Sequence, residues 1–216
     1  MGSVAVLDYG MGNLRSVVKA LEHVSPKTRV VLAANARAVA TADRVIFPGQ
    51  GAIKGCMEAM RFEGLREAVL DAARQRPFLG ICLGLQALYD ESDEGGGVAG
   101  LGLLRGRVRL FGSMSDASGL PLKVPHMGWN QVQQARPHSL WAGIENDARF
   151  YFVHSYYADA VGAPETVGVT DYGLPFTSAA AYENIFATQF HPEKSQRAGL
   201  QLLANFLNWD GRSDRC

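Results

Sequence analysis

A glycine-flanked cysteine between an apolar strand and an apolar helix constrains the fold more than any other feature of this sequence. Residues 77–81 are typical of a buried strand, helical residues follow Gly84, and Cys82 lies at the junction. Gly80 and Gly84 permit the sharp strand-to-helix turn of a nucleophile elbow, which exposes the side chain at its tip. A helix amino terminus also favours the thiolate, the nucleophilic form of cysteine. The alternative is a buried structural cysteine, as most free cysteines are.

The order of elements around this turn predicts an α/β fold. Strand-like segments at 4–8, 28–32, 44–47 (ending at Pro48) and 77–81 alternate with helical segments at 14–24 and about 52–75. Such alternation is typical of a mostly parallel central sheet with helices on both faces.

The second half of the chain has a different pattern. Short strand-like segments separated by turns lie at 107–111, 131–135, 150–154, 166–170, 177–182 and 185–190, before a last helix at 195–208. They predict an antiparallel β extension. Because no repeat or linker interrupts the chain, we expect one domain over residues 1–216.

Composition argues against several classes of protein. The chain has 216 residues, 47% of them hydrophobic, and its 21 Lys and Arg balance 21 Asp and Glu. A neutral chain is not typical of nucleic-acid binders, and no apolar run is long enough to predict a membrane span. No secretory signal is visible. The three cysteines at 56, 82 and 216 form no disulfide or metal pattern. We therefore expect a cytoplasmic protein without metal or cofactor.

Two glycine clusters invite a phosphate-binding interpretation that the residues do not support. Gly10 and Gly12 follow a strand, but Arg15 occupies the place of the third glycine of a dinucleotide fingerprint, so a tight turn is favoured. Asn13 then serves as the helix N-cap. The segment 94–97 lacks the lysine of a phosphate-binding loop and is interpreted as a flexible surface loop.

A second pair of reactive residues lies near the carboxyl terminus. His191 and Glu193 follow a strand-like segment two residues apart, so both can project from one side of a strand end. A cysteine nucleophile and its base need to be adjacent only in space. A lone histidine before Pro-Glu is usually structural. Its combination with an elbow cysteine favours a Cys-His-Glu triad.

These segments resemble the class I (triad) glutamine amidotransferases, whose fold is flavodoxin-like. The nucleophile segment of that class is similar to GICLGLQ at 80–86. Within the class, the resemblance extends almost end to end to the glutaminase subunit of a synthase of histidine biosynthesis. The segments that carry it are DYGMGNL (8–14), PGQG (48–51), PHMGWN (125–130), FVHSY (152–156) and FHPEKS (190–195).

The resemblance implies roles for particular residues. Cys82 would attack the side-chain amide of glutamine, His191 would transfer protons, and Glu193 would orient the imidazole. The oxyanion would be bound by backbone N–H groups of Leu83 and of Gly49 or Gln50. Gln50 departs from the valine common in the family.

The remaining implied residues bind the substrate or the partner. Glutamine would be held by Gly51, Gln86, Ser155 and Tyr156. The partner would be a (βα)8-barrel cyclase subunit, contacted by Asn13, Trp129 and Lys194. Because free ammonia is wasted, we expect rotation of a peptide in the loop 48–51 to keep the glutaminase idle until the partner and its nucleotide are bound.

Three alternatives remain open from the sequence. A paralogous glutaminase subunit could supply ammonia to another acceptor, such as a surface-sugar precursor. A non-catalytic binding module could retain the fold, although the complete triad argues against it. A thiol hydrolase could use the same elbow, but it would have no need of the segments 125–130 and 155–156.

Overall fold

The strands of the first half pair in parallel, as their alternation with helices predicts. The computed structural model describes residues 2–10, 14–61, 64–116 and 118–212. Its parallel strands lie in the order β2 (Arg29–Ala33), β1 (Ser3–Leu7), β3 (Arg44–Gly49), β4 (Phe78–Cys82) and β13 (Ile185–Thr188). Every residue of β4 and β13 is buried, because these central strands are covered on both faces. Because β13 pairs with β4 in parallel, the carboxyl end of β13 lies beside the carboxyl end of β4, at Cys82.

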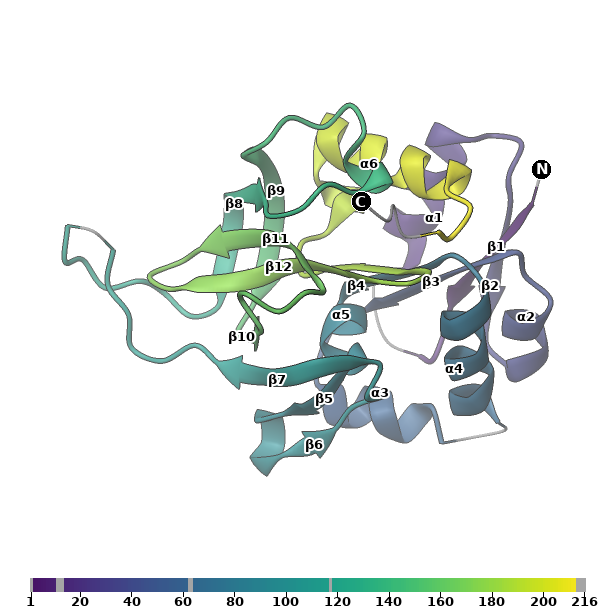
Figure 1. The fold of residues 1–216 in the computed structure, drawn as a ribbon. Coiled ribbons are helices and arrows are strands. Elements are labelled where there is room, and N and C mark those ends of the chain that lie inside the picture. The colour runs from purple at the N-terminus through teal and green to yellow at the C-terminus, as the bar shows by residue number, and fades with distance from the viewer. Residues whose placement is uncertain (1, 11–13, 62–63, 117, 213–216) are drawn as a thin grey trace.

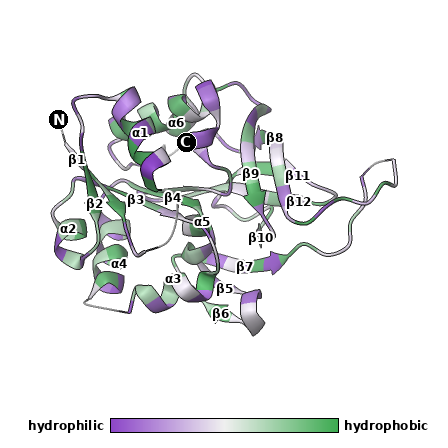
Figure 2. Ribbon diagram, turned by 180° about the vertical axis from the view of Figure 1, so that it is seen from behind, coloured by the Kyte–Doolittle hydropathy of each residue, from purple (hydrophilic) through white to green (hydrophobic). Residues whose placement is uncertain are grey.

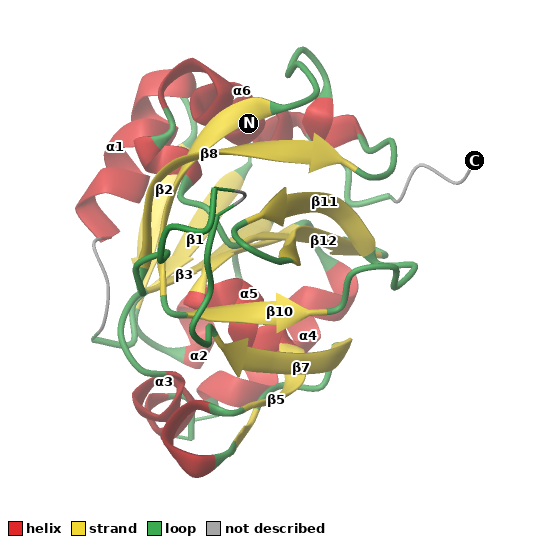
Figure 3. Ribbon diagram, turned by 90° about the vertical axis from the view of Figure 1, so that its left-hand side faces the viewer, coloured by secondary structure: helices red, strands yellow, loops and turns green. Residues whose placement is uncertain are grey.

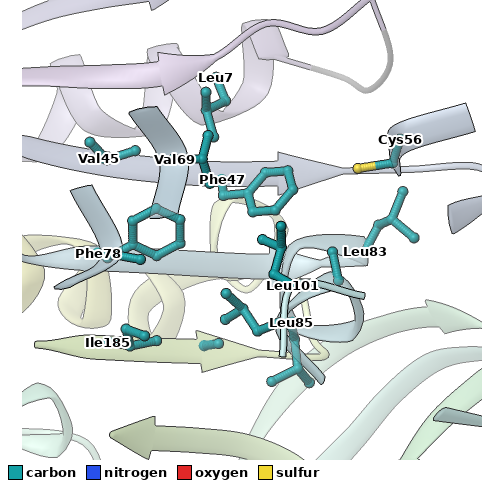
Figure 4. Packing of buried hydrophobic residues seen from close by; sticks show 14 of the residues in the cluster. Leu7, Val45, Phe47, Cys56, Val69, Phe78, Leu83, Leu85, Leu101 and Ile185 are labelled. Atoms are coloured by element: carbon teal, nitrogen blue, oxygen red, sulfur yellow. The ribbon is translucent and has the colours of Figure 1, made fainter. Parts of the chain in front are cut away.

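Helices cover both faces of this parallel half (Figure 1). On one face lie α1 (Leu14–Val24) and α6 (Gln196–Asn208); on the other lie α2 (Ala36–Ala40), α3 (Ile53–Ala59), α4 (Leu65–Gln75) and α5 (Leu83–Leu88). Figure 2 shows apolar residues concentrated in the central strands and on the inward sides of the helices. Phe47, Phe78 and Leu83 belong to the apolar cluster on the α4 side (Figure 4).

Mostly antiparallel strands extend the sheet on the other side of β13, where only β5 and β7 pair in parallel among the described residues. The sheet continues through β12 (Pro175–Tyr182), β10 (Tyr156–Asp159), β7 (Leu104–Leu110), β5 (Tyr89–Ser92) and β6 (Val98–Ala99). A branch from β12 runs through β11 (Thr166–Asp171), β8 (His126–Gln134) and β9 (Ala148–His154), and Figure 3 looks onto it. The predicted fold class, a mostly parallel α/β sheet with an antiparallel extension, is confirmed. None of the helices in the described segments is long and apolar enough to cross a membrane.

Several element boundaries differ from the predictions. β3 continues past the predicted end at Phe47, and its Gly49 pairs with Cys82, because a proline lacks only its own N–H. The short helix α2, which was not predicted, is capped by Asn35, whose side chain accepts a hydrogen bond from the Ala38 N–H. The strands β5, β6 and β10 and the 3-10 turns η1 (Glu94–Gly96), η2 (Ser139–Trp141) and η3 (Pro192–Lys194) were also not predicted.

Candidate active site

The turn at Cys82 has the geometry of a nucleophile elbow. Cys82 lies between β4 and α5 with φ 55° and ψ −105°, a conformation that costs a non-glycine residue on the order of 1–3 kcal/mol. A Cβ atom on Gly84 would lie 1.9 Å from the carbonyl oxygen of Phe47, and one on Gly80 would lie 3.0 Å from Cβ of Ala187. Gly84 is therefore required by its close approach to β3, and Gly80 lies in tight contact with β13.

A cavity of about 320 Å³ lies next to this elbow. The residues that line it are Gln50, Gly51, Cys82, Leu83, Gln86, Glu94, Pro125, Val153, His154, Ser155, Tyr156 and His191. The structure thus brings the predicted nucleophile, the predicted base and all four predicted glutamine-binding residues to one cavity. Gly49, which does not line it, lies beside Cys82 on the neighbouring strand.

His191 and Glu193 form a buried hydrogen-bonded pair. Nδ1 of His191 lies 2.9 Å from Oε1 of Glu193, and the two side chains are only 3% and 2% exposed. Burial alone would lower the pKa of His191, but the charges of Cys82 and Glu193 outweigh it and raise that pKa. Nε2, the other ring nitrogen of His191, is buried, and the interaction of the ring with Cys82 is one cause of the raised pKa, so Nε2 is placed for proton transfer.

The predicted oxyanion loop is held by a residue that sequence reasoning missed. The hydroxyl of Tyr9 donates a hydrogen bond of 2.9 Å to the Pro48 carbonyl. A Cβ atom on Gly49 would lie 2.2 Å from that hydroxyl, so the loop fits only because residue 49 is glycine. Burial raises the pKa of Tyr9 well above its usual value, which keeps the hydroxyl a neutral donor. Gly51 has a φ of 90°, whereas Gln50 does not have a positive φ.

The predicted glutamine-binding residue Gln86 is fixed by two acceptors. Its Nε2 donates to the Tyr156 carbonyl at 2.9 Å and to Oε1 of Gln189 at 3.0 Å. Both amide protons are thereby used, which leaves Oε1 of Gln86 to accept a hydrogen bond in the cavity. Gln189 in turn donates from Nε2 to Sγ of Cys82 at 3.6 Å. Gln189 was not predicted; its only sequence signal is a polar residue in the apolar segment 185–190.

Glu94 lies in the segment 94–97, whose glycines are exposed as predicted for a surface loop, but its own side chain has a contact that was not predicted. Glu94 begins the turn η1, and its Oε2 accepts a hydrogen bond of 2.9 Å from the Ile53 N–H at the start of α3. Its carboxylate therefore lines the cavity, where it supplies negative charge. The three glycines after it all have positive φ values and form the turn. The sequence could not show this, because Ile53 is 41 residues away.

Two of the three predicted interface residues lie on one surface region. Trp129 on β8 is 39% exposed, and its ring packs edge-on against Tyr151 with centroids 6.2 Å apart. Nζ of Lys194 lies 5.9 Å from the centroid of the same Tyr151 ring. No carboxylate among the described residues forms a salt bridge with Lys194. Asn13, predicted both as N-cap and as an interface residue, lies outside the described residues.

Residues that commonly bind metals do not cluster in the described part of the chain. No group of three or more His, Cys, Asp or Glu residues within it could hold a metal ion. The two cysteines described, Cys56 and Cys82, are both buried and free.

Comparison with known proteins defines the class to which this fold and site belong. The family model for class-I glutamine amidotransferases matches residues 5–209, and the chain belongs to that family. The fold is shared with solved structures of low sequence identity. A glutamine amidotransferase crystal structure has a TM-score of 0.69 at 19% identity, covering 95% of this chain and 97% of its own. The PurLQS structure from Thermotoga maritima has a TM-score of 0.68 at 18% identity, and the match covers 96% of this chain and 99% of that chain.

Curated relatives narrow the assignment within the class. The imidazole glycerol phosphate synthase subunit HisH of Nitrosospira multiformis is 56% identical over 97% of this chain and 99% of its own length. The HisH subunit of Pseudomonas syringae pv. syringae is 54% identical over 98% of this chain and 100% of its own length. The chain therefore belongs to the HisH family.

Proposed function

We propose that this chain, a glutaminase subunit of the imidazole glycerol phosphate synthase type, hydrolyses glutamine to glutamate and ammonia through a thioester on Cys82. The thiolate of Cys82 attacks the carbon of the glutamine side-chain amide. The resulting oxyanion accepts hydrogen bonds from the backbone N–H of Leu83 and from that of Gly49 or Gln50. His191 protonates the departing nitrogen, which leaves as ammonia. It then takes a proton from the water that hydrolyses the thioester and releases glutamate.

The cavity offers complementary groups to the rest of the substrate. Oxygen Oε1 of Gln86 can accept a hydrogen bond from a donor group of glutamine. The carboxylate of Glu94 can pair with the α-ammonium group, while Gly51, Ser155 and Tyr156 complete the wall. The observation that carries the proposal is the common cavity of the strained Cys82 and of His191, whose other ring nitrogen is held by Glu193.

Substitution of the nucleophile tests this chemistry. Cys82→Ser should abolish glutamine-dependent product formation by the complex with the cyclase subunit, because a serine hydroxyl is far less acidic than a thiol. The same complex should remain active with an ammonium salt, since only ammonia supply is lost. Substantial glutamine-dependent activity of the variant would remove Cys82 from the mechanism. Cys216→Ser, which makes the same replacement at a cysteine outside all of the motifs, is the matched control.

The proposed partner is a (βα)8-barrel cyclase subunit, to which this chain passes ammonia. Two features support a docking surface at Trp129 and Lys194. Trp129 is exposed, and Lys194 lies over the Tyr151 ring that Trp129 contacts. A lysine without a salt bridge beside an exposed tryptophan suits an acidic partner surface. Trp129→Ala and Lys194→Ala should weaken cyclase binding in calorimetric titration. Tyr182→Ala, at an exposed site on β12, should not. Unchanged affinity in both interface variants would contradict this docking surface.

The proposal also includes a single domain and a cytoplasmic location. One continuous sheet and a family match over residues 5–209 support a single glutamine amidotransferase domain over residues 1–216. The free thiols of Cys56 and Cys82 suit a reducing compartment.

A further inference from the structure

Gln189 is a buried polar residue beside the nucleophile with no role in the mechanism above. It directly follows β13, which pairs with β4 so that Thr188 lies beside Ile81. The next residues along the two strands are Gln189 and Cys82. Gln189 is fully buried, and its Nε2 lies 3.6 Å from Sγ of Cys82. A buried amide in this position needs a partner for each of its polar atoms.

The orientation of the Gln189 amide follows from one backbone carbonyl. The carbonyl oxygen of Tyr156 can only accept hydrogen bonds, so the group of Gln86 that lies 2.9 Å from it must be the nitrogen. That nitrogen, as a donor, requires the oxygen of Gln189 at 3.0 Å. The amide nitrogen of Gln189 is therefore directed to Sγ of Cys82.

The Tyr156 carbonyl also accepts a hydrogen bond from His154. Nδ1 of His154 lies 2.8 Å from the Tyr156 oxygen and donates to it, which uses the second lone pair of that oxygen. The Tyr156 carbonyl is thus saturated by two donors on buried side chains. It has no free lone pair with which to accept another partner, so the orientation of Gln86 and Gln189 is fixed before substrate binds.

We propose that Gln189 is a further catalytic residue, whose Nε2–H group donates a hydrogen bond to Sγ of Cys82 and stabilises the thiolate. A hydrogen bond to a charged acceptor is stronger than one to a neutral acceptor, so the contact favours the ionised sulfur over the thiol. No reorientation is needed when the proton leaves, because Gln86 and the Tyr156 carbonyl already hold the amide. The inference rests on the proposed function for the role of Cys82 as nucleophile.

Alkylation of Cys82 in the full-length chain tests this role without any glutamine turnover. Iodoacetamide reacts with the thiolate, and peptide mass spectrometry distinguishes Cys82 from the other cysteines. Gln189→Met keeps the length of the side chain but removes the N–H donor. Its alkylation rate at neutral pH should fall about tenfold, the loss expected for one hydrogen bond to a charged group. The difference should vanish at a pH high enough to ionise the thiol in both proteins.

Two further variants sharpen the result. Gln189→Glu retains an oxygen for Gln86 but places a second oxygen against the sulfur, so it should react at least as slowly as Gln189→Met. Gln133→Met alters an exposed glutamine on β8 and should react like the unaltered chain. A wild-type rate in Gln189→Met would overturn the proposal. Equal slowing at neutral and at high pH would also overturn it, because that pattern indicates only altered packing.

A measurement on the unaltered chain covers the case in which neither Gln189 variant folds. The side-chain amide proton resonance of Gln189 should shift in NMR spectra when Cys82 is alkylated, whereas that of Gln133 should not. Absence of a shift would overturn the contact. Failure of the proposed function is distinguishable, since it would show as glutamine hydrolysis by Cys82→Ser while the alkylation results for Gln189 still held.

Discussion

His126 on β8 and His154 on β9 are joined by a hydrogen bond with 2.9 Å between Nδ1 of His126 and Nε2 of His154. Because Nδ1 of His154 donates to the Tyr156 carbonyl, its Nε2 can only accept, and His126 is the donor. Nε2 of His126 in turn faces the amide nitrogen of Asn130 at 3.3 Å. This arrangement requires both rings to be neutral. A proton added to Nε2 of His154 would face the N–H of His126, and one added to Nε2 of His126 would face the amide N–H of Asn130. The arrangement also connects β8, which carries Trp129, to the wall of the cavity beside Cys82.

The buried histidine pair predicts that the protein loses stability in mild acid. Burial lowers the pKa of His126 to about 4 and that of His154 to about 3, whereas both titrate near 6.5 in the unfolded chain. Between these values the unfolded chain binds more protons. The contribution of this pair to the free energy of unfolding should therefore be fully present above about pH 6.5 and decrease below it, by up to about 1.4 kcal/mol per pH unit for each histidine.

Urea unfolding at a series of pH values measures this dependence. His126→Gln should flatten the slope below about pH 6.5, because one of the two depressed groups is removed. His23→Gln, which replaces an exposed histidine on α1, should leave the slope unchanged. Identical slopes for the unaltered chain and for His126→Gln would show that the pair does not govern stability in acid.

The elbow predicts strong intolerance at Gly84. Gly84→Ala should destabilise the fold by about 3 kcal/mol, because the added Cβ would overlap the Phe47 carbonyl and separate α5 from β3. Gly112→Ala is the control, since nothing lies within 4 Å of a Cβ atom there. Chemical denaturation of the two variants gives the comparison. A Gly84→Ala variant as stable as Gly112→Ala would mean that the strand and helix readily separate.

Removing the charge of Glu193 should impair catalysis more than folding. Glu193→Gln preserves the size of the side chain but no longer stabilises a protonated His191, so kcat should fall by about 10²–10⁴. The pKa of His191 should fall as well, because Glu193 is one of the two charges that raise it. Glutaminase assays with the cyclase subunit and NMR titration of His191 check both effects. Glu183→Gln, at an exposed turn, is the control; equal activity of the two variants would exclude the proposed role.

Tyr9 should stabilise the resting conformation of the oxyanion loop. Tyr9→Phe removes the hydrogen bond to the Pro48 carbonyl, worth about 1 kcal/mol, and should raise glutamine hydrolysis by the isolated chain about fivefold. The unaltered isolated chain should be nearly inactive and strongly stimulated by the partner with its nucleotide. Steady-state glutaminase rates with and without partner measure the ratio. A basal rate identical to that of the control Tyr182→Phe would remove Tyr9 from the control of the loop.

Gly51 provides an independent test of loop rotation. Gly51→Pro forbids the φ of 90° seen here, so partner stimulation should collapse while the exposed turn leaves the fold intact. A proline at Gly49 would be less informative, because any side chain there collides with the Tyr9 hydroxyl. Calorimetric binding of the cyclase subunit shows whether the variant remains folded. Full stimulation of Gly51→Pro would refute the rotation of this loop as the switch.

Local sequence determined the parallel strands β1 to β4, the helices α1 and α6, and the elbow. Gly80 and Gly84 flank a cysteine between an apolar strand and an apolar helix, and these neighbours suffice to predict the strained turn at Cys82. The pairing of His191 with Glu193 was predictable for the same reason, since the residues are two apart in the chain. Such features depend on backbone geometry over a few residues, which the local residue types govern.

Only the tertiary structure decided which distant residues complete the site. The contact of Gln189 with Cys82 spans 107 residues, that of Tyr9 with Pro48 spans 39, and that of Glu94 with Ile53 spans 41. No local sequence motif identifies the hydrogen-bond partner of any of these polar side chains. Each partner is fixed by the pairing of β13 with β4, or by the packing of loops over the sheet. A hydrogen bond requires its two atoms to lie about 3 Å apart, and strand pairing across the whole chain sets that distance.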